Sequence, residues 1–203
     1  MSWQALPGWF SFPGFYREIV EQAPPGATLV EIGSAFGRSV AFLAREAIDR
    51  KRTDLRIVAV DPFEWQVALG DCVCDTYRRA LAGHAYPFVT MLRGMAIHTP
   101  EELERITLLR LPSVEAARLF DRVHFAFIDG DHAYEPVSQD IRAWMGKATV
   151  LAGHDFDLEG VSRAVRELLP KFGVRPGERL TDDERAGDFL PADGSMGHVW
   201  VRK

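Results

Sequence analysis

The sequence predicts an α/β domain in which a mostly parallel sheet is flanked by crossover helices. Three observations support this fold class. Short β-rich runs alternate along the chain with runs of helical periodicity. The 203 residues are 47% hydrophobic and 26% charged, which is typical of a globular domain and excludes general disorder. No apolar run approaches the roughly 20 residues that a membrane-spanning helix needs.

Strands are predicted where short runs of β-branched and aromatic residues are bounded by turn residues. In chain order they are Thr28–Ile32, Ile57–Val60, Phe88–Leu92, Leu108–Leu111, Val123–Ile128, Thr149–Ala152 and His198–Val201. Pro62 follows the second run and ends it, because proline cannot donate to a strand ladder. We expect the last run to pair antiparallel with a strand near Val174.

Helices are predicted between the strands, where apolar residues recur at intervals of three and four. One helix is expected over Ser39–Arg50, and a capped helix start is expected at Thr99–Glu102. Two later helices should each bury one apolar face. Their apolar residues are Val137, Ile141, Trp144 and Met145 in the first, and Val161, Ala164, Val165, Leu168 and Leu169 in the second.

The two ends of the chain differ in composition from its centre. The segment Trp9–Tyr16 is rich in aromatic residues, which either pack the N-terminus onto the domain or form a lid over a substrate. Residues 178–197 are rich in Asp, Gly and Pro and are expected to form an exposed loop. Cys72 and Cys74 are too few for a disulfide framework and are interpreted as part of a surface loop. No secretory signal is visible, so we expect a cytoplasmic location.

Glycine and acidic residues follow the first two predicted strands, at the edge where parallel sheets bind ligands. The first strand continues into the pattern E-x-G-x-x-x-G, from Glu31 to Gly37, directly before a helix. Glycine lets the backbone approach a ligand, so a Cβ at Gly33 or Gly37 is expected to crowd the ligand or the helix start. Asp61 ends the second strand, where an acid suits the two hydroxyls of a ribose. The combination favours nucleoside binding over tight packing alone.

Four segments carry a resemblance to a known family. They are VEIGSAFGRSVAFLA, VAVDPF, FAFIDGDHAYEPVSQDIRAW and LAGHDFDLEGVSRAV, in this order. Together they resemble class I S-adenosylmethionine-dependent methyltransferases and are most similar to the branch known as methyltransferase domain 24. The resemblance implies a Rossmann-like, doubly wound sheet of seven strands, with helices on both faces and an antiparallel last strand. One departure is the segment 147–153, where relatives usually carry a Gly-Gly pair before the fifth strand.

The resemblance also implies a single methyltransferase domain over residues 1–203. This domain would consist of an aromatic-rich segment (1–25), a cofactor-binding core (26–170) and a C-terminal hairpin and loop (171–203). S-adenosylmethionine would lie over the loop after the first strand, with its ribose on Asp61 and its adenine near Phe63 or Ser113. The residues expected to bind it are Glu31, Gly33, Ser34, Ala35, Gly37, Arg38, Ser39, Asp61, Pro62, Phe63, Ser113 and Asp129.

A second group of polar side chains follows two later strands of the predicted sheet. Adjacent parallel strands lie about 4.8 Å apart, so Asp129 and His132 can converge with His154 and Asp155. Carboxylates together with a neutral imidazole suit a divalent cation. By resemblance to metal-dependent relatives, Asp129, His154 and Asp155 are candidate metal ligands. By the same resemblance His132 is a candidate catalytic base, with Asp129 as a second catalytic residue; otherwise these side chains only shape the pocket.

The leading hypothesis is a methyltransferase that acts on a hydroxyl oxygen of a small molecule, assisted by Mg²⁺ or another divalent cation. The net charge of −5 argues against a nucleic-acid partner, and nothing indicates a membrane partner. Two alternatives stay open: a noncatalytic nucleoside-binding module, and a metal-dependent enzyme of other chemistry on the same fold. The sequence leaves open the acceptor, the metal requirement and whether two copies form a homodimer.

Overall fold

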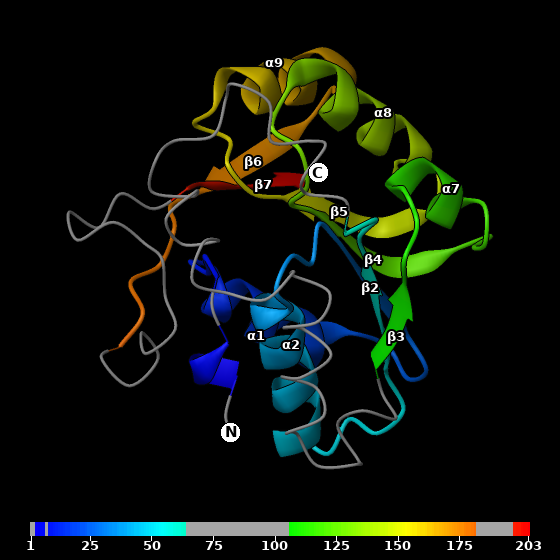
Figure 1. Ribbon diagram of the computed structural model, residues 1–203, viewed down its shortest axis with the longest axis vertical. Helices are drawn as coiled ribbons and strands as arrows, with labels where there is room; N and C mark the ends of the chain where they lie inside the picture. The colour runs from blue at the N-terminus through cyan, green and yellow to red at the C-terminus, as the bar shows by residue number, and fades with distance from the viewer. Residues whose placement is uncertain (1–2, 7, 64–105, 182–196) are drawn as a thin grey trace.

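The computed structural model describes residues 3–6, 8–63, 106–181 and 197–203, which form one sheet with helices on both faces (Figure 1). The seven described strands lie in the order β3-β2-β1-β4-β5-β7-β6. They are β1 Thr28–Ile32, β2 Arg56–Val60, β3 Ile106–Leu109, β4 Val123–Ile128, β5 Ala148–Gly153, β6 Phe172–Arg175 and β7 Val199–Arg202. The first five are mutually parallel, and β7 is antiparallel to β5 and β6, as predicted.

The register brings the carboxyl ends of neighbouring parallel strands into line. Ile32 of β1 is aligned with Val60 of β2 on one side and with Ile128 of β4 on the other. The ladder continues beyond the strands, because the amide of Asp129 donates to Ile32 at 2.8 Å and the amide of His154 donates to Ile128 at 3.0 Å. The residues that follow these strands are therefore fixed side by side.

Helices cover the two faces of the sheet as separate layers (Figure 1). The one face carries η1 Trp3–Ala5, α1 Pro13–Gln22 and α2 Arg38–Asp49, and the other carries α7 Ser113–Ala117, α8 Tyr134–Trp144 and α9 Glu159–Leu168. Each layer encloses its own buried apolar cluster, so the central strands are buried on both faces. None of the described helices is both long and apolar enough to cross a bilayer.

Most of the predicted elements within the described residues are confirmed, with two differences. The strand β3 ends two residues before its predicted end, because the chain leaves the sheet at Arg110 and begins α7 after Pro112. The predicted burial of Met145 is wrong: the residue is 37% exposed, because α8 ends at Trp144. The elements predicted at 88–92 and 99–102, and the two cysteines, lie outside the described residues.

The aromatic N-terminal segment packs into the core and contains a helix that the sequence analysis did not assign. Phe12, Phe15, Tyr16, Ile19 and Val20 are each at most 6% exposed. Their spacing of three and four residues is that of one helix face, so the signal for α1 was present in the sequence. Of the two interpretations of this segment, packing onto the domain is the one that the burial supports.

The first part of the predicted exposed loop packs against the start of α1. The N-cap position of α1 has no side-chain cap of its own. The carboxylate of Glu178 takes this place, accepting hydrogen bonds from the amides of Gly14 at 2.6 Å and Phe15 at 3.2 Å. Leu180 is 7% exposed and belongs to the core. Residues 178–181 thus form a loop as predicted, but the predicted exposure is wrong for Glu178 and Leu180, because these two residues pack against the N-terminal layer.

Candidate functional site

The loop between β1 and α2 has a backbone conformation that needs glycine. Gly33 and Gly37 have φ values of +87° and +81°, in the left-handed region. A Cβ at Gly33 would lie 2.1 Å from the carbonyl oxygen of Asp129 and 2.6 Å from Cα of Gly130. A Cβ at Gly33 would therefore collide with the backbone after β4, whatever lies over the loop. The loops after β1 and β4 are in direct contact.

Asp61 connects the glycine loop to the end of β2. Its side chain is buried, and its two carboxylate oxygens accept hydrogen bonds from the amides of Ala35 at 2.9 Å and Phe63 at 2.6 Å. Both amide donors have positive φ values, +47° for Ala35 and +54° for Phe63, which non-glycine residues rarely adopt. The two amides orient the carboxylate, which is what a paired contact to a ribose diol requires.

Glu31 lies beneath the glycine loop and links three elements. Its carboxylate accepts hydrogen bonds from the hydroxyl of Tyr16 on α1 at 2.7 Å and from the hydroxyl of Ser39 on α2 at 2.8 Å. Burial raises the pKa of Glu31 to about 7, although these hydrogen bonds lower it in part. Burial and the neighbouring Glu31 also raise the pKa of Tyr16 well above its usual value. The sequence analysis missed Tyr16, which it treated only as one of several aromatic residues.

Other residues predicted to bind the cofactor divide between the loop and the core. The amide of Gly37 donates to the carbonyl of Ser34 at 2.6 Å and closes the loop. Arg38 points away from the loop: it is 2% exposed, and its Nη1 donates to the carbonyl of Leu6 at 3.0 Å. The ring of Phe63 is fully buried in the cluster under α1 and α2. The side chains of Arg38 and Phe63 therefore support the fold around the loop.

Pro62 and Ser113 lie at the other end of the predicted cofactor site. The carbonyl of Pro62 accepts a hydrogen bond from Nε of Arg110 at 3.4 Å. Ser113 begins α7, and its hydroxyl accepts a hydrogen bond from Nε1 of Trp144 on α8 at 2.9 Å. Ser113 thus lies at the contact between α7 and α8.

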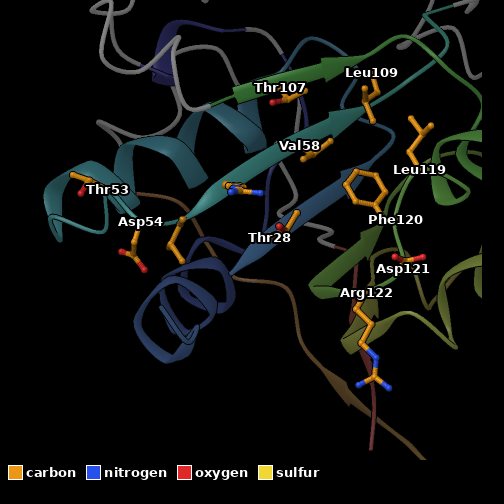
Figure 2. A pocket seen from close by; sticks show the side chains of 12 residues that line it. Thr28, Thr53, Asp54, Val58, Thr107, Leu109, Leu119, Phe120, Asp121 and Arg122 are labelled. Carbon is orange, nitrogen blue, oxygen red and sulfur yellow. The ribbon is translucent and has the colours of Figure 1, made fainter. Parts of the chain in front are cut away.

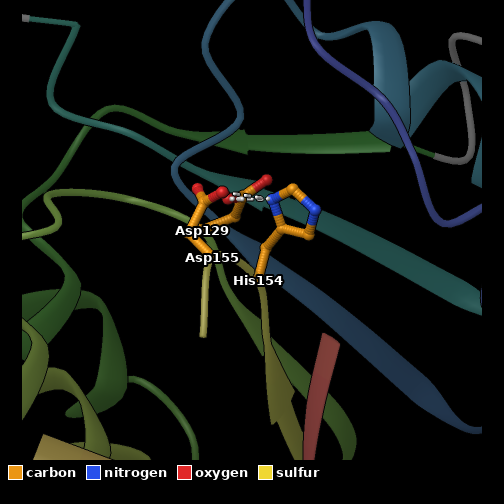
Figure 3. A group of neighbouring side chains, drawn as sticks. All are labelled: Asp129, His154 and Asp155. Carbon is orange, nitrogen blue, oxygen red and sulfur yellow. Dashed lines mark ion pairs between the residues drawn. The ribbon is translucent and has the colours of Figure 1, made fainter. Parts of the chain in front are cut away.

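Asp129, His154 and Asp155 converge where β4 and β5 end (Figure 3). Nδ1 of His154 lies 3.5 Å from Oδ1 of Asp129 and 3.2 Å from Oδ1 of Asp155. Burial alone would lower the pKa of His154, but the two carboxylates outweigh burial and raise it to about 10. This arrangement of two carboxylates around one ring nitrogen favours the protonated form of His154. One ligand atom from each of the three residues lies within 4.8 Å of the others, close enough for all three to contact one cation.

His132 joins this cluster through Asp155. Its Nε2 lies 2.9 Å from Oδ2 of Asp155, and its side chain is 49% exposed. Burial lowers the pKa of His132, but the hydrogen bond to Asp155 outweighs it and raises that pKa. Burial raises the pKa of Asp155, but hydrogen bonds from His132 and His154 outweigh it and lower that pKa. Asp155 has a φ of +55°, and this strained turn directs one carboxylate oxygen to each histidine.

Two residues that the sequence analysis missed hold the far side of the His154 ring. Nε2 of His154 lies 2.8 Å from Oγ of Ser11 and 3.1 Å from the carbonyl oxygen of Gly197. A Cβ at Gly197 would lie 2.3 Å from Oδ1 of Asp155, so only glycine fits there. Ser11 is the one polar residue in the run W-F-S-F, which is the signal that could have drawn attention to it. Nothing local in the sequence indicates the contact of Gly197.

A shallow groove of about 720 Å³ lies apart from these residues (Figure 2). Its lining includes Thr28, Val58 and Thr107 of the sheet and Leu119, Phe120 and Arg122 after α7. Because Thr28 is the first residue of β1, the groove extends toward the ends of the strands opposite Asp61 and Asp129. It adds no group to the polar residues at the carboxyl ends.

The chain matches a family model described as a methyltransferase domain over residues 30–156. This range contains the glycine loop, Asp61, His132 and the Asp129–Asp155 cluster. No curated protein sequence matches the chain.

Several solved structures share the fold. The TDP-rhamnose 3'-O-methyltransferase CalS11, an enzyme of calicheamicin biosynthesis, is 18% identical with a TM-score of 0.56, over 94% of this chain and 76% of its own. The O-methyltransferase NovP is 13% identical with a TM-score of 0.64, over 94% and 79%. TrmN from Thermus thermophilus is 18% identical with a TM-score of 0.57, over 99% of this chain and 51% of its own. At these identities the likeness shows the fold alone.

Proposed function

The chain belongs to the methyltransferase domain family, and on this premise we propose that it transfers a methyl group from S-adenosylmethionine to a hydroxyl oxygen of a small molecule. One observation carries the proposal. The backbone of Gly33 abuts that of Asp129 and Gly130, so the glycine loop and the charged cluster lie edge to edge. A nucleoside cofactor over the loop would then lie next to side chains able to deprotonate an acceptor. That CalS11 and NovP are O-methyltransferases supports oxygen as the acceptor atom.

The first half of the site consists of the glycine loop after β1 and Asp61 after β2, and its residues fit the cofactor. Asp61 would accept hydrogen bonds from the ribose hydroxyls, and the backbone of Gly33, Ser34, Ala35 and Gly37 would lie beneath the cofactor. The hydrogen bond from Ser39 to Glu31, beneath the loop, would stabilise the conformation of the loop. S-adenosylmethionine, when bound, supplies a methyl group on a positively charged sulfur, ready for displacement. Pro62, Ser113 and Asp129 would form the remaining walls, and the buried ring of Phe63 would support them from the core.

The second half of the site consists of Asp129, His132, His154 and Asp155, and it would deprotonate the acceptor. His132 donates from Nε2 to Asp155, which leaves Nδ1 as the basic nitrogen. In the proposed step the acceptor hydroxyl gives its proton to His132, and the oxygen forms a bond to the methyl carbon. The cofactor would supply the methyl group, and the electron pair of its broken carbon–sulfur bond would stay on sulfur. Asp155 holds the imidazole and stabilises its protonated form, while Asp129 balances the charge of His154.

The residues of this half also fit a divalent cation. Two carboxylates and Nδ1 of one imidazole converge, which suits Mg²⁺ or a transition metal. Ser11 and Gly197 hold Nε2 of His154 from outside, as outer hydrogen bonds orient a ligating histidine. A cation held by Asp129, His154 and Asp155 would take the place of the Nδ1 proton and lower the pKa of a bound acceptor hydroxyl.

Calorimetry with S-adenosylhomocysteine tests the cofactor, and an activity assay with EDTA tests the metal. We expect micromolar binding by the wild-type protein, and loss of turnover in EDTA that Mg²⁺ or Mn²⁺ restores. No binding at millimolar S-adenosylhomocysteine would overturn the proposed function. Full turnover in EDTA would contradict the proposed role of the cation but not the proposed deprotonation by His132.

Small molecules are the proposed acceptors because the net charge of −5 does not favour a polyanion. TrmN shares the fold as well, so RNA is the competing substrate class. Methyl transfer to total tRNA or rRNA, measured with radiolabelled S-adenosylmethionine, decides between them. Incorporation into RNA would overturn the small-molecule part of the proposal.

A further inference from the structure

The imidazole ring of His154 has oxygen atoms in contact with both of its nitrogens. Nε2 lies 2.8 Å from the hydroxyl oxygen of Ser11 and 3.1 Å from the carbonyl oxygen of Gly197. A carbonyl oxygen can only accept a hydrogen bond, so Nε2 carries a hydrogen. Nδ1 faces one carboxylate oxygen of Asp129 and one of Asp155 (Figure 3). Between these two negative charges Nδ1 holds either a second proton or a metal ion.

The surroundings of the His154 ring fix its orientation. His154 is 7% exposed, and the ring of Phe12 lies against it with a centroid distance of 4.9 Å. Ser11 is fully buried, and its carbonyl oxygen accepts a hydrogen bond from the amide of Glu178 at 2.6 Å. A Cβ at Gly197 would lie 2.6 Å from Cε1 of His154, so the carbonyl of this residue comes close only because the residue is glycine. Nδ1 therefore points at the two carboxylates before any cation arrives.

A nitrogen ligand changes which cation a pair of carboxylates prefers. Mg²⁺ prefers oxygen ligands in octahedral geometry and gives up its water reluctantly. Imidazole nitrogen suits Fe²⁺, Ni²⁺ and Zn²⁺, and affinity for a mixed site of nitrogen and oxygen rises along the first transition row from Mn²⁺ through Co²⁺. Two carboxylates alone would attract any divalent cation. The third ligand, Nδ1 of His154, is thus the group that can discriminate between cations.

We infer that the cluster of Asp129, His154 and Asp155 selects a transition-metal ion over Mg²⁺, and that Ser11 positions the nitrogen ligand that makes this selection. The inference rests on the part of the proposed function that assigns a divalent cation to this cluster. Ser11 acts through the ring, because its hydroxyl contacts Nε2 while the cation would lie at Nδ1. Outer hydrogen bonds of this kind orient a ligating histidine and raise its affinity for the metal.

Metal binding by the wild-type protein tests the selection without a turnover assay. Calorimetry with Co²⁺ and with Mg²⁺, in the same buffer, should give an affinity for Co²⁺ at least about 10-fold higher. Pulsed EPR of the protein loaded with Mn²⁺ should show coupling of the metal to an imidazole nitrogen. A site made only of carboxylates and water gives no such coupling.

Two variants test the roles of His154 and Ser11. His154→Asp replaces the nitrogen ligand with oxygen, so the nitrogen coupling should disappear and the preference for Co²⁺ should fall by about 10-fold. Ser11→Ala keeps the ligand but removes its outer partner, and should weaken Co²⁺ binding by about 10-fold. Ser162→Ala is the matched control, since it removes a buried serine hydroxyl that donates to the carbonyl of Glu159, and should leave Co²⁺ affinity unchanged. His198→Ala removes an exposed histidine outside the cluster and should keep the nitrogen coupling.

Each outcome separates this inference from the proposed function. Equal affinities for Co²⁺ and Mg²⁺, or a nitrogen coupling that persists in folded His154→Asp, would overturn the selection by His154 and leave methyl transfer intact. Wild-type affinity for Co²⁺ in Ser11→Ala would overturn the positioning role of Ser11. Binding of Co²⁺ without any binding of S-adenosylhomocysteine would overturn the proposed function and leave the selection in place. If His154→Asp does not fold, a wild-type protein without nitrogen coupling overturns the inference instead.

Discussion

The carboxyl ends of β1 and β2 are built differently from those of β4 and β5. At β1 and β2 the backbone determines most of the geometry: Gly33 adopts a positive φ, and Asp61 is oriented by two amides. At β4 and β5 side chains of opposite charge face one another, with His154 between the carboxylates of Asp129 and Asp155. The first half is defined by shape and the second by charge.

The comparison indicates how each half responds to substitution. A change of shape near β1 should cost stability or cofactor affinity, and a change of charge near β5 should cost turnover. The two halves touch where Gly33 meets the backbone of Asp129. A substitution at this contact is therefore the one most able to affect both.

The largest effect is expected from His132→Ala. Turnover should fall by about 10²- to 10⁴-fold, as for the loss of a general base, while the affinity for S-adenosylhomocysteine stays within about twofold. Steady-state kinetics and calorimetry measure the two quantities. His124→Ala, a histidine near the start of β4, is the matched control and should keep its turnover. An equal loss of affinity and turnover in His132→Ala would contradict the claim that cofactor binding and deprotonation depend on different halves of the site.

Gly33→Ala should destabilise the fold by about 4 kcal/mol, at the top of the range for single substitutions. Its methyl group would collide with the carbonyl oxygen of Asp129, in addition to the cost of a positive φ. Gly26→Ala is the control, because Gly26 has a φ of +74° but no atom of the described residues within 4 Å of its Cβ position. That variant should lose only about 1–2 kcal/mol. Similar urea midpoints for the two variants would mean that the loops after β1 and β4 are not in contact.

Stability should fall as the pH rises from about 4.5 to about 7, because of Glu31. In this window the folded protein keeps the proton of Glu31 whereas the unfolded chain releases it, so raising the pH favours unfolding. At about 1.4 kcal/mol per pKa unit the loss approaches 3 kcal/mol. Urea unfolding at several pH values, compared between the wild type and Glu31→Gln, isolates this term. If the stabilities of the two proteins varied with pH in the same way, Glu31 would already be ionised in the folded protein.

Asp61→Ala should weaken binding of S-adenosylhomocysteine by about 10- to 100-fold through the loss of charged hydrogen bonds to the ribose. Calorimetry measures the change, and Asp121→Ala, an exposed acid before β4, serves as the control. Turnover at saturating cofactor should change less than affinity does. An unchanged affinity would place the ribose elsewhere than the end of β2.

The smallest effect concerns a residue outside both halves. Glu178→Ala removes the acceptor for the first amides of α1 and should cost about 1 kcal/mol, the usual value of a helix N-cap. Thermal unfolding measures it, with Glu21→Ala at the other end of α1 as the control. A loss of turnover without a loss of stability would mean that Glu178 acts on the charged cluster.

The sequence predicted the parts of the molecule that depend on neighbours along the chain. The spacing from Glu31 to Gly37 and the acid at Asp61 are local patterns, and the described strands carry them where the patterns indicated. The convergence of Asp129 with Asp155 followed from the pairing of adjacent parallel strands. In each case a short segment determines its own conformation, and the pairing of strands determines which segments lie side by side.

What could not be predicted depends on contacts between distant segments. Ser11 touches His154 across 143 residues, and no periodicity encodes such a pairing. Tyr16 was hidden among other aromatic residues, and Asp140 occupies a position on α8 where periodicity expects an apolar side chain. Met145 followed the apolar spacing, but the helix ends one residue before it.

The contact between Glu178 and α1 has a consequence for the order in which the protein is completed. Glu178 lies 164 residues after the helix start that it caps, and Arg175 forms an ion pair with Glu18 of the same helix at 2.7 Å. During synthesis the donors in the first turn of α1 leave the ribosome long before Glu178, the residue that accepts from them, has been translated. The helix α1 is thus secured only after residues 175–178 have been translated, and a nascent chain that stops before residue 175 lacks both contacts.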